Sequence, residues 1–170
     1  MTIEVRPAKR EELERVNELR RQVNDLHVQG RPGHFRPGFN QQLQRHVYDQ
    51  FESETGDVLV ALADGEVAGF ATVIYVHRPE GPYTLPLDFY HVEEFGVDAA
   101  HRRQGIGRAL VDYMRSNAVE RGFTRIDLDA WAFIESALAF YQKVGFVPYR
   151  WYFEMTTGDG AADKQQLSSV

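Results

Sequence analysis

The sequence predicts a single domain of the α/β or α+β class, built around a mixed sheet. Its 170 residues fit one domain, and an apolar fraction of 43% with a charged fraction of 26% is ordinary for a globular protein. Segments with helical periodicity alternate with segments in which apolar residues recur at every second position. That alternation is typical of helices packed on a sheet.

The chain is predicted to begin with a short strand that stops at Pro7. A helix over 10–27 follows, because its apolar residues recur every three or four positions. The next segment, 31–39, contains two prolines and two glycines and is predicted to be an ordered loop before a second helix over 40–51.

The remaining elements follow from turn signals and periodicity. In order, they are a hairpin over 57–76 that turns at Asp64-Gly65, a strand over 87–98, a helix over 104–121, a strand over 124–131, a helix over 134–145 and strand material over 146–156. We therefore expect six or seven strands and about four helices. We place the domain at 1–156 and predict that the polar tail, 157–170, is disordered.

Composition excludes several classes of site and partner. The absence of cysteine excludes disulfides, thiolate metal sites and a cysteine nucleophile. The six histidines lack ligand spacing, so we expect no metal. A net charge of −6 argues against a nucleic-acid partner. Without a secretory signal or a long apolar run, we expect a cytoplasmic protein that does not engage a membrane.

The segment 101–110, HRRQGIGRAL, places Gly105 and Gly107 where a helix begins. Helix amino termini carry unpaired N–H groups and bind phosphates, and glycines would let an anion approach the main chain. Three arginines add positive charge: Arg102, Arg103 and Arg108. The alternative is a solvated helix cap. The glycine spacing matches neither G-x-x-x-x-G-K-[ST] nor G-x-G-x-x-G.

Two motifs resemble the GNAT superfamily of N-acetyltransferases. RRQGIG, at 102–107, matches the Q/R-x-x-G-x-G/A motif, and ALAFYQKVGF, at 137–146, resembles the A-x-x-x-Y-x-K-x-G-F segment of the same superfamily. The resemblance covers about residues 3–156. It implies a single GNAT-like domain whose central, mostly antiparallel sheet splays open to give a V-shaped slot for acetyl-CoA, the co-substrate.

The resemblance also implies which residues contact acetyl-CoA. Backbone amides of Gln104–Arg108 would cradle its pyrophosphate, and the strand at Phe95–Val97 would pair with its pantetheine arm. The candidate cofactor-binding residues are Phe95, Gly96, Val97, Arg102, Arg103, Gln104, Gly105, Ile106, Gly107, Arg108, Ser136, Tyr141 and Lys143. One departure is Ile134, which stands where many relatives have an asparagine.

Tyr141 aligns with the tyrosine that family members place near the cofactor sulfur. A phenol titrates near pH 10, so a neutral tyrosine can protonate a departing thiolate. Tyr141 is therefore the candidate general acid. The alternative is a core aromatic residue.

The candidate bases are His91, Glu93 and Glu94, all in the strand YHVEEFGV. Regular alternation groups His91, Glu93, Phe95 and Val97 on one face, whereas a bulge would promote Glu94. The resemblance implies a base at His91 or Glu93. The alternative for these carboxylates is a solvated strand end or a salt bridge to Arg102 or Arg125.

The resemblance places the loop RPGHFRPGF beside the acceptor, so His34, Phe35 and Phe39 are candidate substrate-binding residues. The alternative is an ordered loop pinned by buried phenylalanines. Asp129 is a further candidate for binding a cationic amine, as is Asp127, although surface pairing would also explain both carboxylates.

Together these features predict an acetyl-CoA-dependent N-acetyltransferase that acts by direct attack of a primary amine in a ternary complex. The acceptor would be a small-molecule or peptide amine, such as a polyamine, an aminoglycoside or a protein amine, and a homodimer is the default expectation. One alternative is a GNAT-fold acyl-CoA-binding sensor or scaffold without turnover. Another is unrelated nucleotide binding through the glycine turn.

Overall fold

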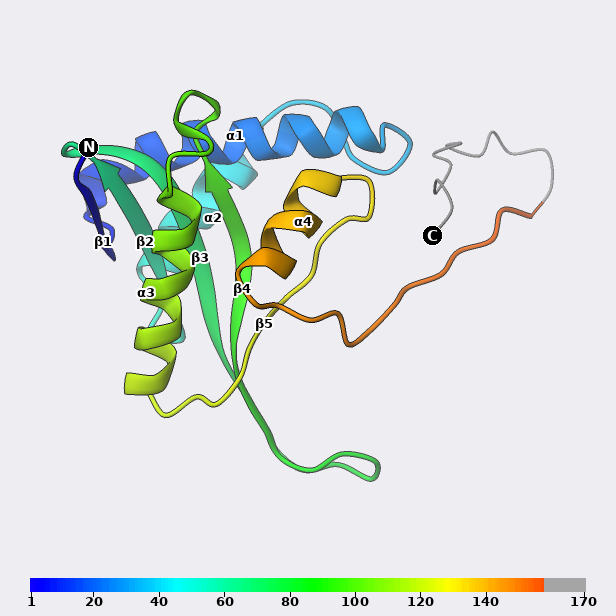
Figure 1. Cartoon of the computed structure of the whole chain (residues 1–170). Helices are drawn as coiled ribbons and strands as arrows, with labels where there is room; N and C mark the ends of the chain where they lie inside the picture. Colours follow the sequence, from blue (N-terminus) through cyan, green and yellow to red (C-terminus); the bar gives the residue numbers. More distant parts are fainter. Residues whose placement is uncertain (158–170) are drawn as a thin grey trace.

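The computed structural model describes residues 1–157. Its elements are β1 (Ile3–Pro7), η1 (Arg10–Glu12), α1 (Leu13–Gly30), α2 (Gln41–Phe51), β2 (Gly56–Ala63), β3 (Glu66–Arg78), β4 (Leu87–Val97), η2 (Ala99–His101), α3 (Ile106–Glu120), β5 (Ile126–Leu128) and α4 (Glu135–Lys143). The strands form one sheet in the order β1-β2-β3-β4-β5 (Figure 1). The predicted α/β class and the four helices are confirmed.

The sheet is mixed and mostly antiparallel. β1 to β4 pair antiparallel in sequence, and β5 pairs parallel to β4. The β2–β3 hairpin turns at Asp64 and Gly65, whose φ angles of 49° and 90° are the positive values that a tight two-residue hairpin turn requires. The dipeptide therefore predicted this turn correctly.

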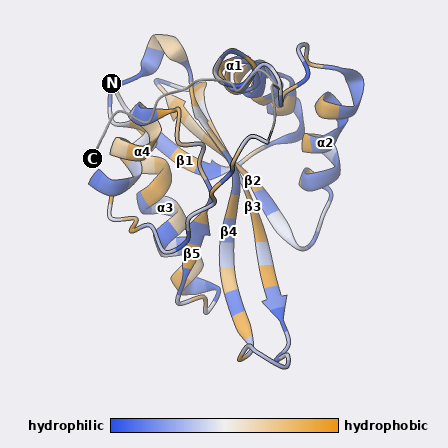
Figure 2. Cartoon of the chain, turned by 90° about the vertical axis from the view of Figure 1, so that its right-hand side faces the viewer, coloured by the Kyte–Doolittle hydropathy of each residue, from blue (hydrophilic) through white to orange (hydrophobic). Residues whose placement is uncertain are grey.

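Helices cover both faces of the sheet, as Figure 2 shows. On one face α3 buries Ile106, Leu110 and Met114 against the sheet. On the other face α1 and α2 bury a second core that includes Leu13, Val16, Leu19, Val47 and Phe70. The period of two in β2 sends alternate side chains into these two cores.

The sheet opens between β4 and β5. Only three residue pairs join them: Tyr90↔Ile126, His91↔Asp127 and Val92↔Leu128. After Val92, β4 continues to Val97 and pairs with β3 alone among the described residues. The expected splay is therefore present, and it exposes one main-chain edge of β4 immediately before the glycine turn.

The predicted strand count of six or seven is wrong, because the described residues contain five strands. Residues 146–156 form no strand, although they are rich in residues that favour one. Pro148 lacks an N–H donor. Side chains hold this segment instead: Tyr149 donates to Asp127 at 3.0 Å, and Arg31 contacts Glu154.

The proposed tail, 157–170, lies outside the described residues except for Thr157.

Within residues 1–157, every helix is too short or too polar to cross a bilayer.

Candidate active site

A β-bulge in β4 determines where the candidate bases point. Thr72 pairs with Glu94 and Val73 with Val92, so Glu93 is the extra residue. The bulge puts both glutamates on the face that α1 and α2 cover. The regular alternation predicted for this strand therefore holds from His91 to Glu93 and is wrong from Glu94 onward.

Phe95 and Val97 lie on the opposite face of the sheet, where they pack against the α3 core. His91 shares the face of the two glutamates, because its neighbours Tyr90 and Val92 belong to the α3 core. The bulge thus gathers all three candidate bases on one face.

Both carboxylate oxygens of Glu94 are hydrogen-bonded to a buried arginine of α1. Its two carboxylate oxygens accept from Arg20 Nε at 2.5 Å and Arg20 Nη2 at 2.8 Å. Arg20 is only 3% exposed and also donates to Asn17 and to the Leu43 carbonyl. Glu94 is therefore the counterion of a buried charge, and the expected partners Arg102 and Arg125 are wrong for it.

Glu93 faces α2. Its carboxylate accepts from Gln50, and His46 Nε2 lies 3.4 Å away. The side chain is about one-third exposed, and its neighbour His46 lines the groove described below. Neither Arg102 nor Arg125 pairs with it in the described part of the chain.

His91 forms a pair with Asp127 across the β4–β5 ladder. Its Nδ1 lies 2.8 Å from Asp127 Oδ1. Asp127 is buried, accepts from Tyr149 at 3.0 Å and has Arg125 at 3.6 Å. The carboxylate selects the tautomer with a proton on Nδ1, which leaves the Nε2 lone pair available to take a proton.

Tyr141 packs against the unpaired part of β4. Its ring contacts Phe95 edge-on at a centroid distance of 6.0 Å, with Phe140 and Phe146 on its other sides. Burial, with the nearby charge of Asp129, raises the pKa of Tyr141 from 10 to about 12. The raised pKa keeps the phenol protonated at neutral pH, and its hydroxyl makes no hydrogen bond to another described residue, so the proton is not already committed to a partner.

The turn before α3 presents open amides. Arg103 and Gly105 adopt left-handed φ angles of 65° and 92°. The first backbone bond at the start of α3 runs from Ala109 N to Gly105 O, so the amides of Gly105–Arg108 have no backbone partner among the described residues. The three arginines predicted there are exposed and form no ion pair within residues 1–157.

The other two glycines of this region serve packing. A Cβ at Gly107 would lie 3.1 Å from Phe140 of α4, and one at Gly96 would lie 2.6 Å from Phe70 and 2.9 Å from Val23 of α1. A substitution at Gly107 would therefore disturb α4 as well as the turn. Ile106 is a core residue, so only its amide faces the turn.

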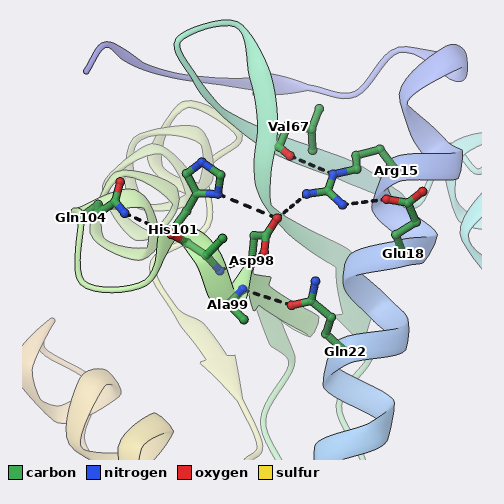
Figure 3. A network of polar contacts seen from close by, with 9 residues as sticks. Arg15, Glu18, Gln22, Val67, Asp98, Ala99, His101 and Gln104 are labelled. Carbon is green, nitrogen blue, oxygen red and sulfur yellow. Dashed lines mark hydrogen bonds and ion pairs between the residues drawn. The ribbon is translucent and has the colours of Figure 1, made fainter.

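A polar network ties the turn to α1, as Figure 3 shows. Buried Asp98 accepts from the Ala100 amide at 3.0 Å and from Arg15 of α1. Gln22, also of α1, accepts from the Ala99 amide at 3.1 Å. The helix that carries Arg20 therefore also fixes the start of the glycine turn.

The predicted acceptor loop meets the β5–α4 connection. His34 and Phe35 each lie 5.1 Å from Trp131, ring centroid to ring centroid. Phe39 instead lies beneath Arg20, whose guanidinium is 5.4 Å from the ring. Asp129 is exposed on the connection after β5.

A groove of about 1020 Å³ runs between α1, this loop and α2. Arg20, Asn24, Phe35, Arg36, Asn40, Gln41, Gln42, Leu43, Arg45, His46, Asp49 and Glu94 line it. It therefore reaches β4 at Glu94, the one candidate base among its lining residues. Because Arg36 and Arg45 line it together with Asp49, the groove is not uniformly acidic.

Two residues predicted on α4 remain without a contact that defines a role. Ser136 and Lys143 are both exposed, and the N-cap residue of α4, Ile134, makes no side-chain capping bond. No group of three or more histidines and carboxylates within residues 1–157 is arranged to hold a metal ion.

Sequence reasoning missed the role of Asp127 as the partner of His91, and it missed Arg20 and Trp131 entirely. The pairing of β4 with β5 brings Asp127 to His91, and nothing in the linear order of residues fixes that register. The apolar periodicity of the first helix gives no sign that one of its arginines, Arg20, is buried.

Comparison with known proteins agrees with the motifs. The model of the acetyltransferase (GNAT) family matches residues 20–146. Human N-acetyltransferase 8 is 35% identical over 101 residues, which is 59% of this chain and 43% of that protein. Mycothiol acetyltransferase of Paenarthrobacter aurescens is 33% identical over 114 residues, 67% of this chain and 33% of that protein. The chain thus spans less than half the length of these relatives.

Solved structures share the fold over nearly the whole chain. A variant of the BH1408 protein from Bacillus halodurans superposes with a TM-score of 0.86 at 24% identity, covering 91% of this chain and 99% of that one. AAC(6')-Iy, bound to the bisubstrate analogue CoA-S-monomethyl-acetylneamine, gives 0.72 at 18% identity, covering 92% and 99%. With the family model spanning residues 20–146, these findings show that the chain belongs to the GNAT acetyltransferase family.

Proposed function

We propose that this protein is an acetyl-CoA-dependent N-acetyltransferase that acetylates a primary amine by direct attack in a ternary complex. The observation that carries the proposal is the opening of the sheet after Val92↔Leu128, directly before a turn with open amides. Family membership supports the same reaction.

The residues of this slot fit acetyl-CoA. The open amides of Gly105–Arg108 and the positive end of α3 would bind the pyrophosphate, with Arg102, Arg103 and Arg108 supplying countercharge. The unpaired edge of β4 at Phe95–Val97 would bind the pantetheine amides as a further strand. Bound acetyl-CoA supplies an electrophilic thioester to the amine.

His91 is the best-supported base. Its Nε2 takes the proton that the attacking amine nitrogen must lose, while Asp127 holds Nδ1 and stabilises the charged ring. Tyr141 donates its phenolic proton to the departing thiolate sulfur. Glu94 takes no part in proton transfer because Arg20 occupies both of its oxygens. Glu93, which lies beside the groove residue His46, would bind the acceptor as an ammonium ion before deprotonation.

The first experiment is titration calorimetry of acetyl-CoA into the purified protein. We expect micromolar binding that weakens by at least tenfold when Arg103→Gln and Arg108→Gln are combined. Arg78→Gln removes an exposed arginine from the far end of β3 and should leave the affinity unchanged. Equal affinity in all three proteins would contradict the phosphate site.

A panel of amines then tests turnover by release of free CoA. It should contain a polyamine, an aminoglycoside, an amino acid and a peptide with a free amino terminus, because both charges line the groove. Binding of acetyl-CoA without release of CoA for any amine would favour the acyl-CoA-binding sensor or scaffold.

A further inference from the structure

The groove between α1, the loop 31–39 and α2 differs in charge from the chain as a whole. The whole chain carries a net charge of −6. The groove, in contrast, is lined by three arginines, Arg20, Arg36 and Arg45, and by two carboxylates, Asp49 and Glu94. Its lining therefore has an excess of positive charge although the protein is acidic.

Only some of these charges are neutralised within the protein. Arg20 and Glu94 are joined by two hydrogen bonds. Arg36 and Arg45 are exposed and form no ion pair or side-chain hydrogen bond with another residue of 1–157. Asp49 has no such partner there either, although it follows Arg45 by one turn of α2. Two arginines thus remain available in the groove against one carboxylate.

The two available arginines belong to different walls of the groove. Arg36 lies in the loop 31–39, and Arg45 lies in the second turn of α2. A guanidinium group donates to carboxylate or phosphate oxygens through a planar fork of N–H groups. An anionic group bound in this groove would therefore receive donors from two elements of the fold.

The groove also reaches the part of β4 where the acceptor amine is expected. Glu94 lines it at β4, and the adjacent Glu93 lies 3.4 Å from Nε2 of the groove residue His46. A positive group of the acceptor would be attracted to Glu93, and a negative group to Arg36 and Arg45. The charges of the site are thus divided between two places.

We propose that the acceptor is a small zwitterionic amine, a primary amine that also carries a carboxylate or phosphate group. This inference rests on the proposed function, because it takes the amine to bind at Glu93. Arg36 and Arg45 bind the anionic group. The groove volume of about 1020 Å³ suits a small molecule. A polyamine would instead bring a second positive charge toward two arginines that lack a countercharge.

Calorimetry on the protein saturated with CoA tests the acceptor class. The ligands are ω-amino acids from glycine to 6-aminohexanoate and ω-aminoalkyl phosphates of the same chain lengths. Their neutral amides and alcohols and the diamines of equal length are the comparisons. At the best length, we expect the anionic compounds to bind about tenfold more tightly or better, because they add charge-assisted hydrogen bonds. The tighter of the two anionic series identifies carboxylate or phosphate.

Variants of the two arginines test which residues bind the anionic group. Arg36→Gln combined with Arg45→Gln should weaken binding of the best anionic amine by about tenfold or more and leave the neutral amine unchanged. The matched control combines Arg78→Gln with Arg150→Gln, two exposed arginines outside the groove lining. Replacing Arg36 and Arg45 with glutamate should make the diamine the preferred ligand, which misfolding would not do. A parallel loss of CoA affinity in the groove variants would assign the arginines to the cofactor and overturn the proposal.

Release of CoA from acetyl-CoA with the same compounds separates this proposal from the proposed function. Turnover of neutral amines or diamines with equal or higher kcat/KM would overturn the zwitterionic acceptor and leave the transferase in place. Arginine-dependent binding of an anionic amine without any CoA release would support the groove assignment and contradict the transferase. Equal affinity for all compounds, or binding of none, would overturn the proposal.

Discussion

The two ends of α3 carry the same residue types but differ in how many of their polar groups are satisfied. Each end has a glycine in the left-handed region, Gly105 with φ 92° and Gly122 with φ 83°. At the carboxyl end, Arg121 donates to Asp57 at 3.0 Å and to Asn117 at 3.2 Å, and it stacks 4.3 Å from the Tyr75 ring. The arginines at the amino end have no such partners within residues 1–157.

The same contrast holds along β4. Arg20 occupies both oxygens of Glu94, whereas Asp127 occupies only one nitrogen of His91. Groups whose bonding capacity is used inside the protein hold the fold together. Other groups keep unused hydrogen-bonding capacity and are available to a ligand. They lie on the unpaired edge of β4 and at the amino terminus of α3.

The largest expected effect is on turnover at His91. His91→Gln should lower kcat by about 10²–10⁴-fold, the usual contribution of a general base, and leave acetyl-CoA affinity within twofold. The matched control is His77→Gln, because His77 Nδ1 also lies 2.9 Å from an aspartate, Asp88, but on an exposed part of the hairpin. Steady-state kinetics on the best amine measures both. Equal activity in the two variants would remove His91 as the base.

Glu94→Gln should instead affect stability. It leaves the buried Arg20 without a countercharge, which costs about 2–4 kcal/mol of unfolding free energy. Glu52→Gln breaks the exposed Arg10–Glu52 pair and should cost no more than about 0.5 kcal/mol. Urea unfolding compares the two variants. A loss of turnover without a loss of stability in Glu94→Gln would assign Glu94 to catalysis and break the contrast along β4.

The two glycines of α3 give the sharpest comparison of its ends. Gly105→Ala and Gly122→Ala each force a left-handed φ on alanine and should lose about 1–2 kcal/mol of stability. Only Gly105→Ala should weaken acetyl-CoA binding, by about tenfold, because relaxation of that turn would redirect the open amides. Calorimetry measures both affinities. An equal loss at Gly122 would mean that the effect arises from helix stability and not from the turn.

Local patterns predicted most of the fold, and non-local register decided the rest. The hairpin turn at Asp64-Gly65 and the periodicity of α1 and α3 depend on residues close in sequence, so they were predicted correctly. The bulge at Glu93 depends on how β4 meets β3. The strand expected over 146–156 is absent although β5 ends the sheet beside it, and side chains such as Tyr149, which donates to Asp127, attach the segment instead.

The candidate site divides along the same line. The glycine turn and Tyr141 could be found from motifs, since their spacing is fixed within one segment. The pairing of His91 with Asp127 joins residues 36 positions apart, and the bond between Arg20 and Glu94 joins residues 74 apart. These contacts follow from the sheet and cannot be read from one strand at a time.

The smallest expected effect concerns alkaline pH. Burial raises the pKa of Tyr141 to about 12, so the folded protein holds this proton where the unfolded chain, with a pKa near 10, releases it. The stability that the neutral phenol contributes is complete below pH 10 and is lost as the pH rises from 10 to 12. Tyr141→Phe should therefore lose less unfolding free energy than the natural chain between pH 9.5 and 11.

Tyr83→Phe is the matched control, because Tyr83 is 99% exposed and should leave the pH dependence unchanged. Burial also raises the pKa values of Tyr75 and Tyr90, whose hydroxyls donate to Asp57 and Asn117, respectively, near the carboxyl end of α3. Both tyrosines are present in all three proteins, so their contribution to the pH dependence is the same in each. Urea unfolding at several pH values isolates Tyr141. If all three proteins lose stability in parallel, the Tyr141 proton is not held by burial, and its assignment as the proton donor to the thiolate loses its physical basis.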